Sequence, residues 1–246
     1  LGNNTRYNGS STNYVGWNLK ANGAGSSNTD GSVTSTVSAN TTSGFSIVSY
    51  TGTGSNATVG HGLSVAPDVV LIKGRSNTDN WFMKHPSLNA NQYLYLNDTA
   101  SVRSGNNVWN NTNPDATKIY VGTDGGVNGN GTTYVGYAWT QKKGYSKFGS
   151  YTGNGSTNGA FAYTGFKPAF VMIKTNTDSG EWAMFDNKRN IGNETADVLR
   201  ANSNSAESDS TGNNSIDILS NGFKVKGTGG WVGTNGRGFI YMAFAE

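Results

Sequence analysis

An internal repeat limits the folds that are open to this chain of 246 residues. The hexapeptide Tyr-Thr-Gly-Thr-Gly-Ser at 50–55 returns as Tyr-Thr-Gly-Asn-Gly-Ser at 151–156, which is 101 positions further on. The apolar run at 69–73 matches the run at 170–174 at the same spacing. Self-similarity at a fixed period indicates that one structural unit is built more than once. The sequence therefore predicts two similar bodies in tandem.

The repeat also predicts where the units begin and end. After an insertion of four residues, the spacing becomes 105, and Gly122-Thr123 matches Gly227-Thr228. We place the first unit at 44–143 and the second at 144–246. Residues 1–20 resemble the end of the first unit and are predicted to be the last hairpin of an upstream repeat. Residues 21–43 are predicted to be a linker with one strand, near 32–38, because Val and Thr favour β structure.

The composition predicts that both units are all-β. Gly, Asn, Ser and Thr make up about half of the chain, and the aromatic residues lie in short apolar runs between them. This pattern is typical of short strands joined by tight turns. The connections are too short and too polar for crossover helices, so the strands should pair antiparallel. The expected fold is two tandem antiparallel β-sandwich domains, each jelly-roll-like.

Several classes of function are excluded or disfavoured by the residues. The chain has no cysteine, which excludes disulfides, thiol nucleophiles and Cys-based zinc sites. Its 18 basic residues are scattered, so no nucleic-acid partner is expected. No apolar stretch approaches the roughly 20 residues that span a bilayer. Asp124-Gly-Gly lacks the dense acidic spacing of a calcium loop, so we expect a turn there and neither metal nor cofactor.

The sequence gives little support for catalysis. His61 and His85 are the only histidines, and neither is repeated in the second copy. No Gly-x-Ser-x-Gly elbow is present, and the two copies share no pair of carboxylates. We expect a protein that is not an enzyme. A polysaccharide depolymerase with a site at a subunit seam stays an alternative.

Tryptophans and tyrosines are the main candidates for structural and binding roles. Trp81 and Trp182 occupy one position of the repeat, and so do Tyr50 and Tyr151. Because a shared position favours a shared structural role, we expect these four residues to anchor the cores.

Two further tryptophans behave differently in the sequence. Trp109 and Trp231 lie in Gly/Asn-rich stretches and lack an aromatic counterpart in the other copy. They are candidates for contact with a ligand or with another subunit, and local packing is the alternative. For the same reason, ligand contacts are expected in the non-matching segments 97–117 and 201–215.

Residues 44–246 resemble an uncharacterised repeat family of virion structural proteins, often tail-fibre proteins, of tailed and often marine phages. The motifs that carry the resemblance are Tyr50-Thr-Gly-Thr-Gly, Val59-Gly-His-Gly-Leu, Ala66-Pro-Asp-Val-Val-Leu-Ile-Lys, Tyr93-Leu-Tyr-Leu-Asn, Gly149-Ser-Tyr-Thr-Gly-Asn-Gly, Gly165-Phe-Lys-Pro-Ala-Phe-Val-Met-Ile-Lys, Asn221-Gly-Phe-Lys and Tyr241-Met-Ala-Phe-Ala-Glu. Members usually continue past this last strand, so the end at Glu246 is expected to reflect truncation or processing.

The resemblance implies a bacteriophage virion protein of a tail fibre, appendage or surface decoration, located on the virion surface or otherwise extracellular. It implies other virion proteins and further copies of the chain as partners, with a trimer expected by analogy with fibres. Loops at one end are candidates for host attachment through a surface glycan. It supplies no catalytic residues. The alternative to a phage origin is a cellular adhesin or a subunit of an extracellular filament.

Overall fold

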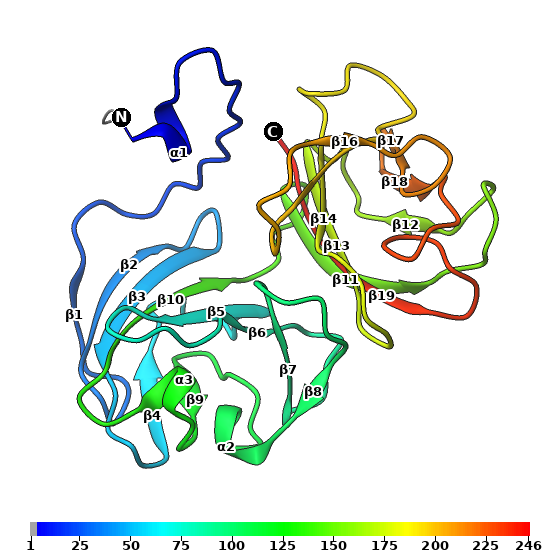
Figure 1. The fold of residues 1–246 in the computed structure, drawn as a ribbon. Coiled ribbons are helices and arrows are strands. Elements are labelled where there is room, and N and C mark those ends of the chain that lie inside the picture. The colour runs from blue at the N-terminus through cyan, green and yellow to red at the C-terminus, as the bar shows by residue number, and fades with distance from the viewer. Residues whose placement is uncertain (1–3) are drawn as a thin grey trace.

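A computed structural model describes residues 4–246 and shows a protein that is almost entirely β, which confirms the predicted fold class (Figure 1). Its helices are three single turns, α1 (Thr5–Asn8), α2 (Asn106–Trp109) and α3 (Gly125–Asn128). All paired strands run antiparallel. Glycine-rich turns connect them, as the composition predicts.

The first half of the chain forms an eight-stranded sheet and a two-stranded sheet, which we call unit 1. In spatial order the large sheet contains β1 (Ser26–Asn28), β2 (Ser35–Asn40), β3 (Phe45–Thr51), β10 (Thr133–Trp139), β5 (Val69–Gly74), β6 (Phe82–Lys84), β7 (Gln92–Tyr95) and β8 (Arg103–Ser104). The small sheet pairs β4 (Ala57–Gly60) with β9 (Lys118–Val121). Figure 1 shows unit 1 at the lower left.

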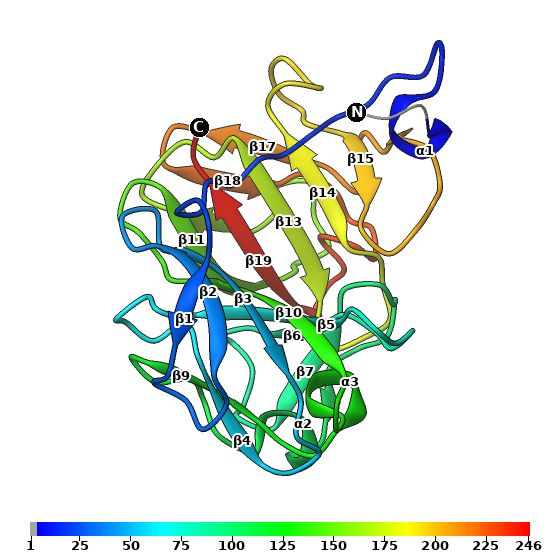
Figure 2. The same cartoon turned by 90° about the vertical axis from the view of Figure 1, so that its left-hand side faces the viewer.

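The second half forms a six-stranded sheet and a three-stranded sheet, which we call unit 2. The six strands are β11 (Ser146–Thr152), β19 (Gly238–Phe244), β13 (Phe170–Thr175), β14 (Ala183–Asp186), β15 (Asp197–Arg200) and β16 (Ser208–Asp209), and the three strands are β12 (Phe161–Tyr163), β18 (Gly222–Val225) and β17 (Ile216–Leu219). In Figure 2 unit 2 lies above unit 1.

The two large sheets share one strand order once β1 and β2 are set aside. The order β3-β10-β5-β6-β7-β8 in unit 1 corresponds to β11-β19-β13-β14-β15-β16 in unit 2. The pairing of β4 with β9 corresponds likewise to that of β12 with β18. The sequence repeat is therefore also a repeat of sheet topology.

The N-terminal segment differs from the prediction in two ways. Residues 1–3 of the expected upstream hairpin lie outside the described residues, and residues 4–25 contain α1 but no strand, so the hairpin prediction is wrong there. Tyr14 instead donates its hydroxyl to Thr5 O and accepts from Gly9 N. The Tyr14 hydroxyl thus closes a compact turn in place of a strand pairing.

Residues 21–43 also do more than link two parts of the chain. The strand expected at 32–38 forms as β2 at Ser35–Asn40, and it pairs with both β1 and β3. Val33 adds an isolated parallel bridge to Val59 of β4. This segment is therefore an integral edge of unit 1, because Val37 of β2 packs into the core cluster of that unit.

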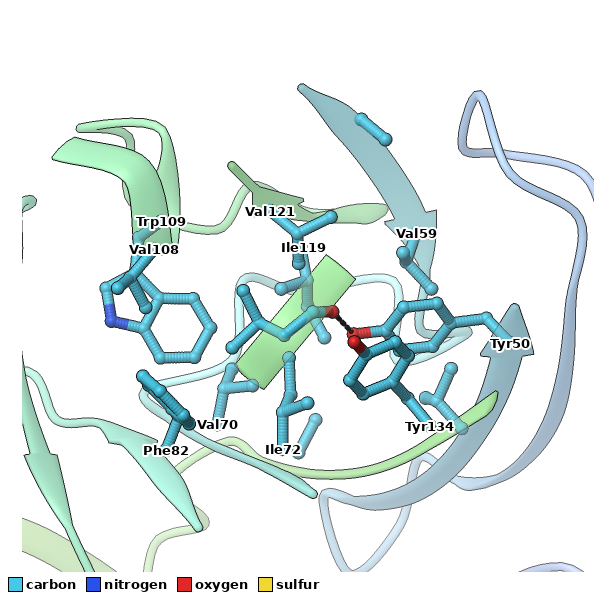
Figure 3. Packing of buried hydrophobic residues seen from close by; sticks show 14 of the residues in the cluster. Tyr50, Val59, Val70, Ile72, Phe82, Val108, Trp109, Ile119, Val121 and Tyr134 are labelled. Carbon is cyan, nitrogen blue, oxygen red and sulfur yellow. Dashed lines mark hydrogen bonds between the residues drawn. The ribbon is translucent and has the colours of Figure 1, made fainter. Parts of the chain in front are cut away.

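Each unit has its own apolar core between its sheets. Figure 3 shows the core of unit 1, where Val70 and Ile72 of β5 point toward Ile119 and Val121 of β9. The corresponding cluster of unit 2 contains Val171, Ile173, Phe223, Val225 and Phe239. Such packing of two sheet faces is the basis of a β-sandwich.

A buried tyrosine hydroxyl forms the same hydrogen bond in both units. Tyr50 donates to Val127 O at 2.5 Å in unit 1 (Figure 3), and Tyr151 donates to Val232 O at 2.8 Å in unit 2. Burial raises the pKa of both hydroxyls well above the usual value, so both remain donors. The repeated Tyr-Thr-Gly motif therefore ties β3 to the turn before β10 in unit 1, and β11 to the turn before β19 in unit 2.

Replacing Tyr50 or Tyr151 with phenylalanine should lower the free energy of unfolding by about 1 kcal/mol, because a buried carbonyl loses its donor. The two losses should add in the double variant, since the sites share no partner. Urea unfolding followed by tryptophan fluorescence measures both. Tyr163→Phe is the matched control, because that side chain is 64% exposed, and it should change stability by less than about 0.5 kcal/mol.

Candidate functional site at the junction of the two units

A third apolar cluster lies between the units and belongs to both. Val69 and Leu71 of β5 and Trp139 of β10 contribute from unit 1, whereas Trp182 and Met242 contribute from unit 2. Because Val70 and Ile72 face the core of unit 1, β5 is covered on both faces. This arrangement explains why residues 69–73 form a continuous apolar run.

Backbone hydrogen bonds also cross the junction. Val102 N donates to Asn176 O at 3.0 Å, and Gly180 N donates to Thr99 O at 2.8 Å. Thr99 O also accepts from the buried ammonium of Lys174 at 3.1 Å. Burial lowers the pKa of Lys174 to about 8. Part of the segment 97–117, which was expected to vary with ligand contact, is therefore used to hold unit 2.

Trp182 makes a side-chain contact across the same junction. Its indole is 1% exposed, and its Nε1 donates to Tyr95 O of unit 1 at 2.9 Å. Its repeat partner, Trp81, is only partly buried and stacks on Tyr137 of its own unit at a centroid distance of 6.5 Å. The backbone N–H of each tryptophan donates to an asparagine side chain, Asn97 or Asn202. The two positions thus share local geometry but differ in burial.

The main cavity of the junction is a groove of about 490 Å³ that the N-terminal segment partly covers. Its apolar lining comes from both units and from that segment, and includes Trp17, Leu71, Met83, Trp139, Phe170, Met172, Met242 and Phe244. Asp186, Lys188 and Glu246 also line it. Lys188 and Glu246 form an ion pair, but both side chains are about 70% exposed, so the pair contributes little to stability.

Trp17 connects the N-terminal segment to unit 2 beside this groove. Its ring meets Phe170 edge-on at a centroid distance of 5.1 Å, and the guanidinium of Arg189 lies 5.9 Å from the Trp17 centroid. Arg189 is held in turn by Asp186 at 2.7 Å and by Glu207. The groove can hold apolar groups, but the described residues that line it include neither histidine nor serine. Its lining is therefore suited to binding an apolar group.

Sequence reasoning did not identify this groove. A signal was available, because Trp139 and Phe244 match at a spacing of 105, and each lies at the end of a strand whose alternate positions are already apolar. Large apolar residues on both faces of a paired strand indicate two buried surfaces.

Both histidines are buried and face backbone carbonyls. His85 Nε2 lies 3.1 Å from Tyr241 O across the junction, and its Nδ1 accepts from Ser87 N. Burial lowers the pKa of His85 to about 4, so the ring is neutral and carries its proton on Nε2. His61 Nε2 lies 3.1 Å from Asp115 O, and burial lowers its pKa as well. Both rings are therefore engaged in hydrogen bonds with the backbone.

A family model of a domain of unknown function, DUF7483, matches residues 1–246. The chain belongs to this family. Comparison with curated proteins finds no match, and comparison with solved structures finds none either. The DUF7483 match includes the N-terminal segment and both units. The family model therefore describes the whole tandem and not a single unit.

Two further observations concern the described part of this DUF7483 chain. Residues 4–246 contain no group of three or more His, Asp or Glu side chains that could hold a metal ion. None of the helices in this range has the length and hydropathy needed to cross a bilayer.

The structure corrects the expectation for Trp109 in the DUF7483 chain. Its side chain is 2% exposed and packs with Val108 in the core of unit 1 (Figure 3), so it is not available for a ligand or another subunit. Both residues lie in α2, which turns them inward beneath β9. Trp109 therefore has a local packing role, which was the alternative given for it in the sequence analysis.

Trp231 is partly buried against the core of unit 2 and lies under Arg200, whose guanidinium is 5.3 Å from its centroid. The repeat explains why unit 1 has no tryptophan there. Its counterpart is Gly126, where an added Cβ would lie 2.1 Å from Phe82. The counterpart of Phe82 in unit 2 is Ala183. Unit 1 therefore combines Phe82 with Gly126, whereas unit 2 combines Ala183 with Trp231. This exchange of a large and a small residue indicates that Trp231 has a packing role.

Proposed function

We propose that this DUF7483 protein is a non-enzymatic structural component of a phage virion, in a tail fibre, an appendage or a surface decoration. The observation that carries the proposal is the buried junction, which joins two copies of one β-unit into a single body. Shared apolar cores and crossing hydrogen bonds make such a tandem stiff, and stiffness is what an exposed appendage requires. The resemblance of residues 44–246 to virion proteins supports the proposed location.

The state of the polar side chains supports a structural role. Both histidines hydrogen-bond to carbonyls, and the best-buried acid, Asp186, is held by Arg189. Hydrogen bonds from Arg189 lower the pKa of Asp186 against the opposing effect of its burial. These groups are committed to holding the fold together, which favours scaffolding over catalysis.

The remaining parts of the proposal concern partners. We propose that copies of the chain assemble with one another, as a trimer by analogy with fibres, and with other virion proteins. Contact with a host glycan is proposed for the exposed loops of unit 2. In residues 201–215 these loops carry exposed serine and asparagine side chains that can hydrogen-bond to sugars.

Location can be tested on tailed phage particles whose genome encodes this chain. Antibodies against the purified protein should label the fibres or the particle surface in immunogold images, and mass spectrometry should find the protein in gradient-purified particles. Antibodies against a major capsid protein provide the control for particle integrity. If the protein is absent from purified particles but present in the cell-surface fraction, the virion proposal is wrong and the adhesin alternative is favoured.

A further inference from the structure

One segment closes one side of the sandwich in unit 1. Its first part, residues 32–35, bonds to the outer edge of β4, where Val33 N donates to Thr58 O at 3.0 Å and Ser32 exchanges hydrogen bonds with Thr58. Its second part is β2, which pairs with the outer edge of β3. Residues 32–40 therefore satisfy the open edges of both sheets at once.

The side chains of this segment also fill the space between the two edges. Val37 is 6% exposed and belongs to the core cluster. A Cβ placed on Gly62 would lie 2.9 Å from Val37 and 3.2 Å from Ala39, so this glycine makes room for the segment. Ser35 Oγ donates to Gly60 O at 2.9 Å. Small residues thus seal this side of unit 1.

Unit 2 lacks such a segment. In the described chain β11, the counterpart of β3, pairs with β19 alone, and β12, the counterpart of β4, pairs with β18 alone. The residues before β11 supply only one isolated bridge, between Lys142 and Ser146, because Tyr145 N and Ser146 N both donate to Lys142 O in a tight turn. Phe148 N donates to the side chain of Gln141 at 3.4 Å. Beyond these contacts, the two sheet edges that residues 32–40 cover in unit 1 have no strand partner in unit 2.

Backbone groups of β12 point away from the sheet at this edge. Val225 N donates to Ala160 O, and Thr164 N donates to Asn221 O, so alternate residues bond toward β18. The side toward which the backbone N–H and C=O groups point alternates from residue to residue along an antiparallel strand. The N–H and C=O groups of Phe161 and Tyr163 therefore point outward. Both residues are exposed, at 47% and 64%.

β11 presents a similar edge. Gly153 N donates to Arg237 O, and the alternation then directs Tyr151 and Gly149 toward β19 and Ser150 outward. Ser150 is exposed, and it corresponds to Ser49, which lies opposite Thr36 of β2 in unit 1. An incoming strand would therefore find the same register that β2 uses.

A cavity of about 450 Å³ lies between these two edges. Ser146 and Lys147 line it from β11, and Tyr163, Thr164 and Gly165 line it from β12 and the following turn. Gly165 has a positive φ of 83°, as Gly62 has at 69°. Gln141, Lys143 and Gly144 of the turn before β11 also line this cavity. The groove of unit 2 thus lies beside the position that Ala39 occupies in unit 1.

We propose that this groove binds an extended strand from a partner polypeptide. The partner strand would carry small hydroxyl and β-branched side chains like those of residues 32–40, with a carboxylate at the position that corresponds to Ala39. The strand would add to β11 and supply the outward backbone groups of β12 with partners, a mode known as β-augmentation. The inference rests on the sheet edges and the groove between them, so it does not depend on a virion location.

The carboxylate follows from one difference between the units. Ala39 lies opposite Ser46 on β3, and the counterpart of Ser46 is Lys147. Neither Lys147 nor the neighbouring Lys143 forms an ion pair with a described residue. A lysine at a strand edge discourages pairing with uncharged strands, so it selects a partner that brings an acid.

Register-specific cross-linking tests the proposal on the full chain. Because the chain has no cysteine, Ser150→Cys provides a single thiol, and the probe is a synthetic peptide of residues 29–42 that carries Thr36→Cys and Ala39→Glu. With oxidised glutathione as the oxidant, we expect disulfide formation with Ser150→Cys at least tenfold faster than with Ser205→Cys, an exposed loop control. Ser49→Cys should react no faster than this control, because its own β2 already occupies the site.

Charge exchange tests the selectivity separately. The peptide with Ala39→Glu should bind at least tenfold more tightly than the peptide with Ala39 retained, and Lys147→Glu should reverse this order. Fluorescence anisotropy of labelled peptides measures both. Equal reaction of Ser150→Cys and Ser205→Cys with the acidic peptide would overturn the docking site. Equal affinity of the two peptides would overturn the assigned carboxylate. Neither result depends on whether virions contain the protein.

Discussion

Replacing Trp182 with alanine should lower the free energy of unfolding by about 3–5 kcal/mol, the range found for buried tryptophans. The indole is 1% exposed and lies between the two units, so its removal leaves a cavity in the junction cluster. It also leaves Tyr95 O without the donor that Nε1 provides. Guanidinium unfolding followed by circular dichroism measures the loss.

The repeat supplies a matched control for this change. Trp81→Ala removes the same side chain from the corresponding position, but its ring is only partly buried and has no hydrogen bond to the other unit. We expect a cost of about 1–2 kcal/mol there, in proportion to the smaller apolar area that is lost. Trp182→Phe should fall between the two, since it keeps most of the packing and loses the Nε1 donor. Equal costs at Trp81 and Trp182 would show that the junction does not hold the units together.

The sequence predicted the interior of each unit better than the contact between them. The inward positions Val70 and Ile72 and the return of Tyr50 as Tyr151 report on packing that each unit makes with itself, and such packing repeats with the sequence. The junction occurs once in the tandem, and its only signal in the sequence is indirect: strands that are apolar on both faces, as at residues 69–73 and near Trp139 and Phe244. Trp182 and Trp81 look equivalent in the sequence, but Trp182 is buried inside the junction cluster and hydrogen-bonds to Tyr95 O of unit 1, whereas Trp81 is only partly buried beside the same cluster.

Single residues without a counterpart were misjudged for a related reason. Trp109 lies in a Gly/Asn-rich stretch, which predicts an exposed loop, but the single turn α2 places it in the core. The polar segment before Phe45 was predicted to be a linker with one strand near 32–38; the strand forms, but its role as an edge of unit 1 was not foreseen. Its Val and Thr residues form a strand because an open edge of β3 is available beside them. Short helical turns and edge pairings depend on tertiary contacts, and local composition does not reveal them.

Lowering the pH should lower the free energy of unfolding through protonation of His85. Its pKa is about 4 in the folded protein, because burial disfavours the charged ring and the nearby Lys84 acts in the same direction. The ordinary value of about 6.5 applies to the unfolded chain. Between these two values the unfolded state binds the additional proton, so stability falls as the pH falls. The contribution is fully present above about pH 6.5 and is lost by about pH 4.

The expected loss from this one residue is about 3 kcal/mol, since each pKa unit corresponds to about 1.4 kcal/mol. His85→Gln isolates the contribution, because a glutamine amide can donate to Tyr241 O and accept from Ser87 N without titrating. Urea unfolding of both proteins from pH 7.5 to pH 4 should show the parent losing about 3 kcal/mol more than the variant. His61, whose pKa is also lowered, and the carboxylates contribute equally to both and cancel in the difference. Parallel pH profiles would mean that the ring at the junction is open to water, and the hydrogen bond to Tyr241 O could then not be one of the contacts that fix unit 2 on unit 1.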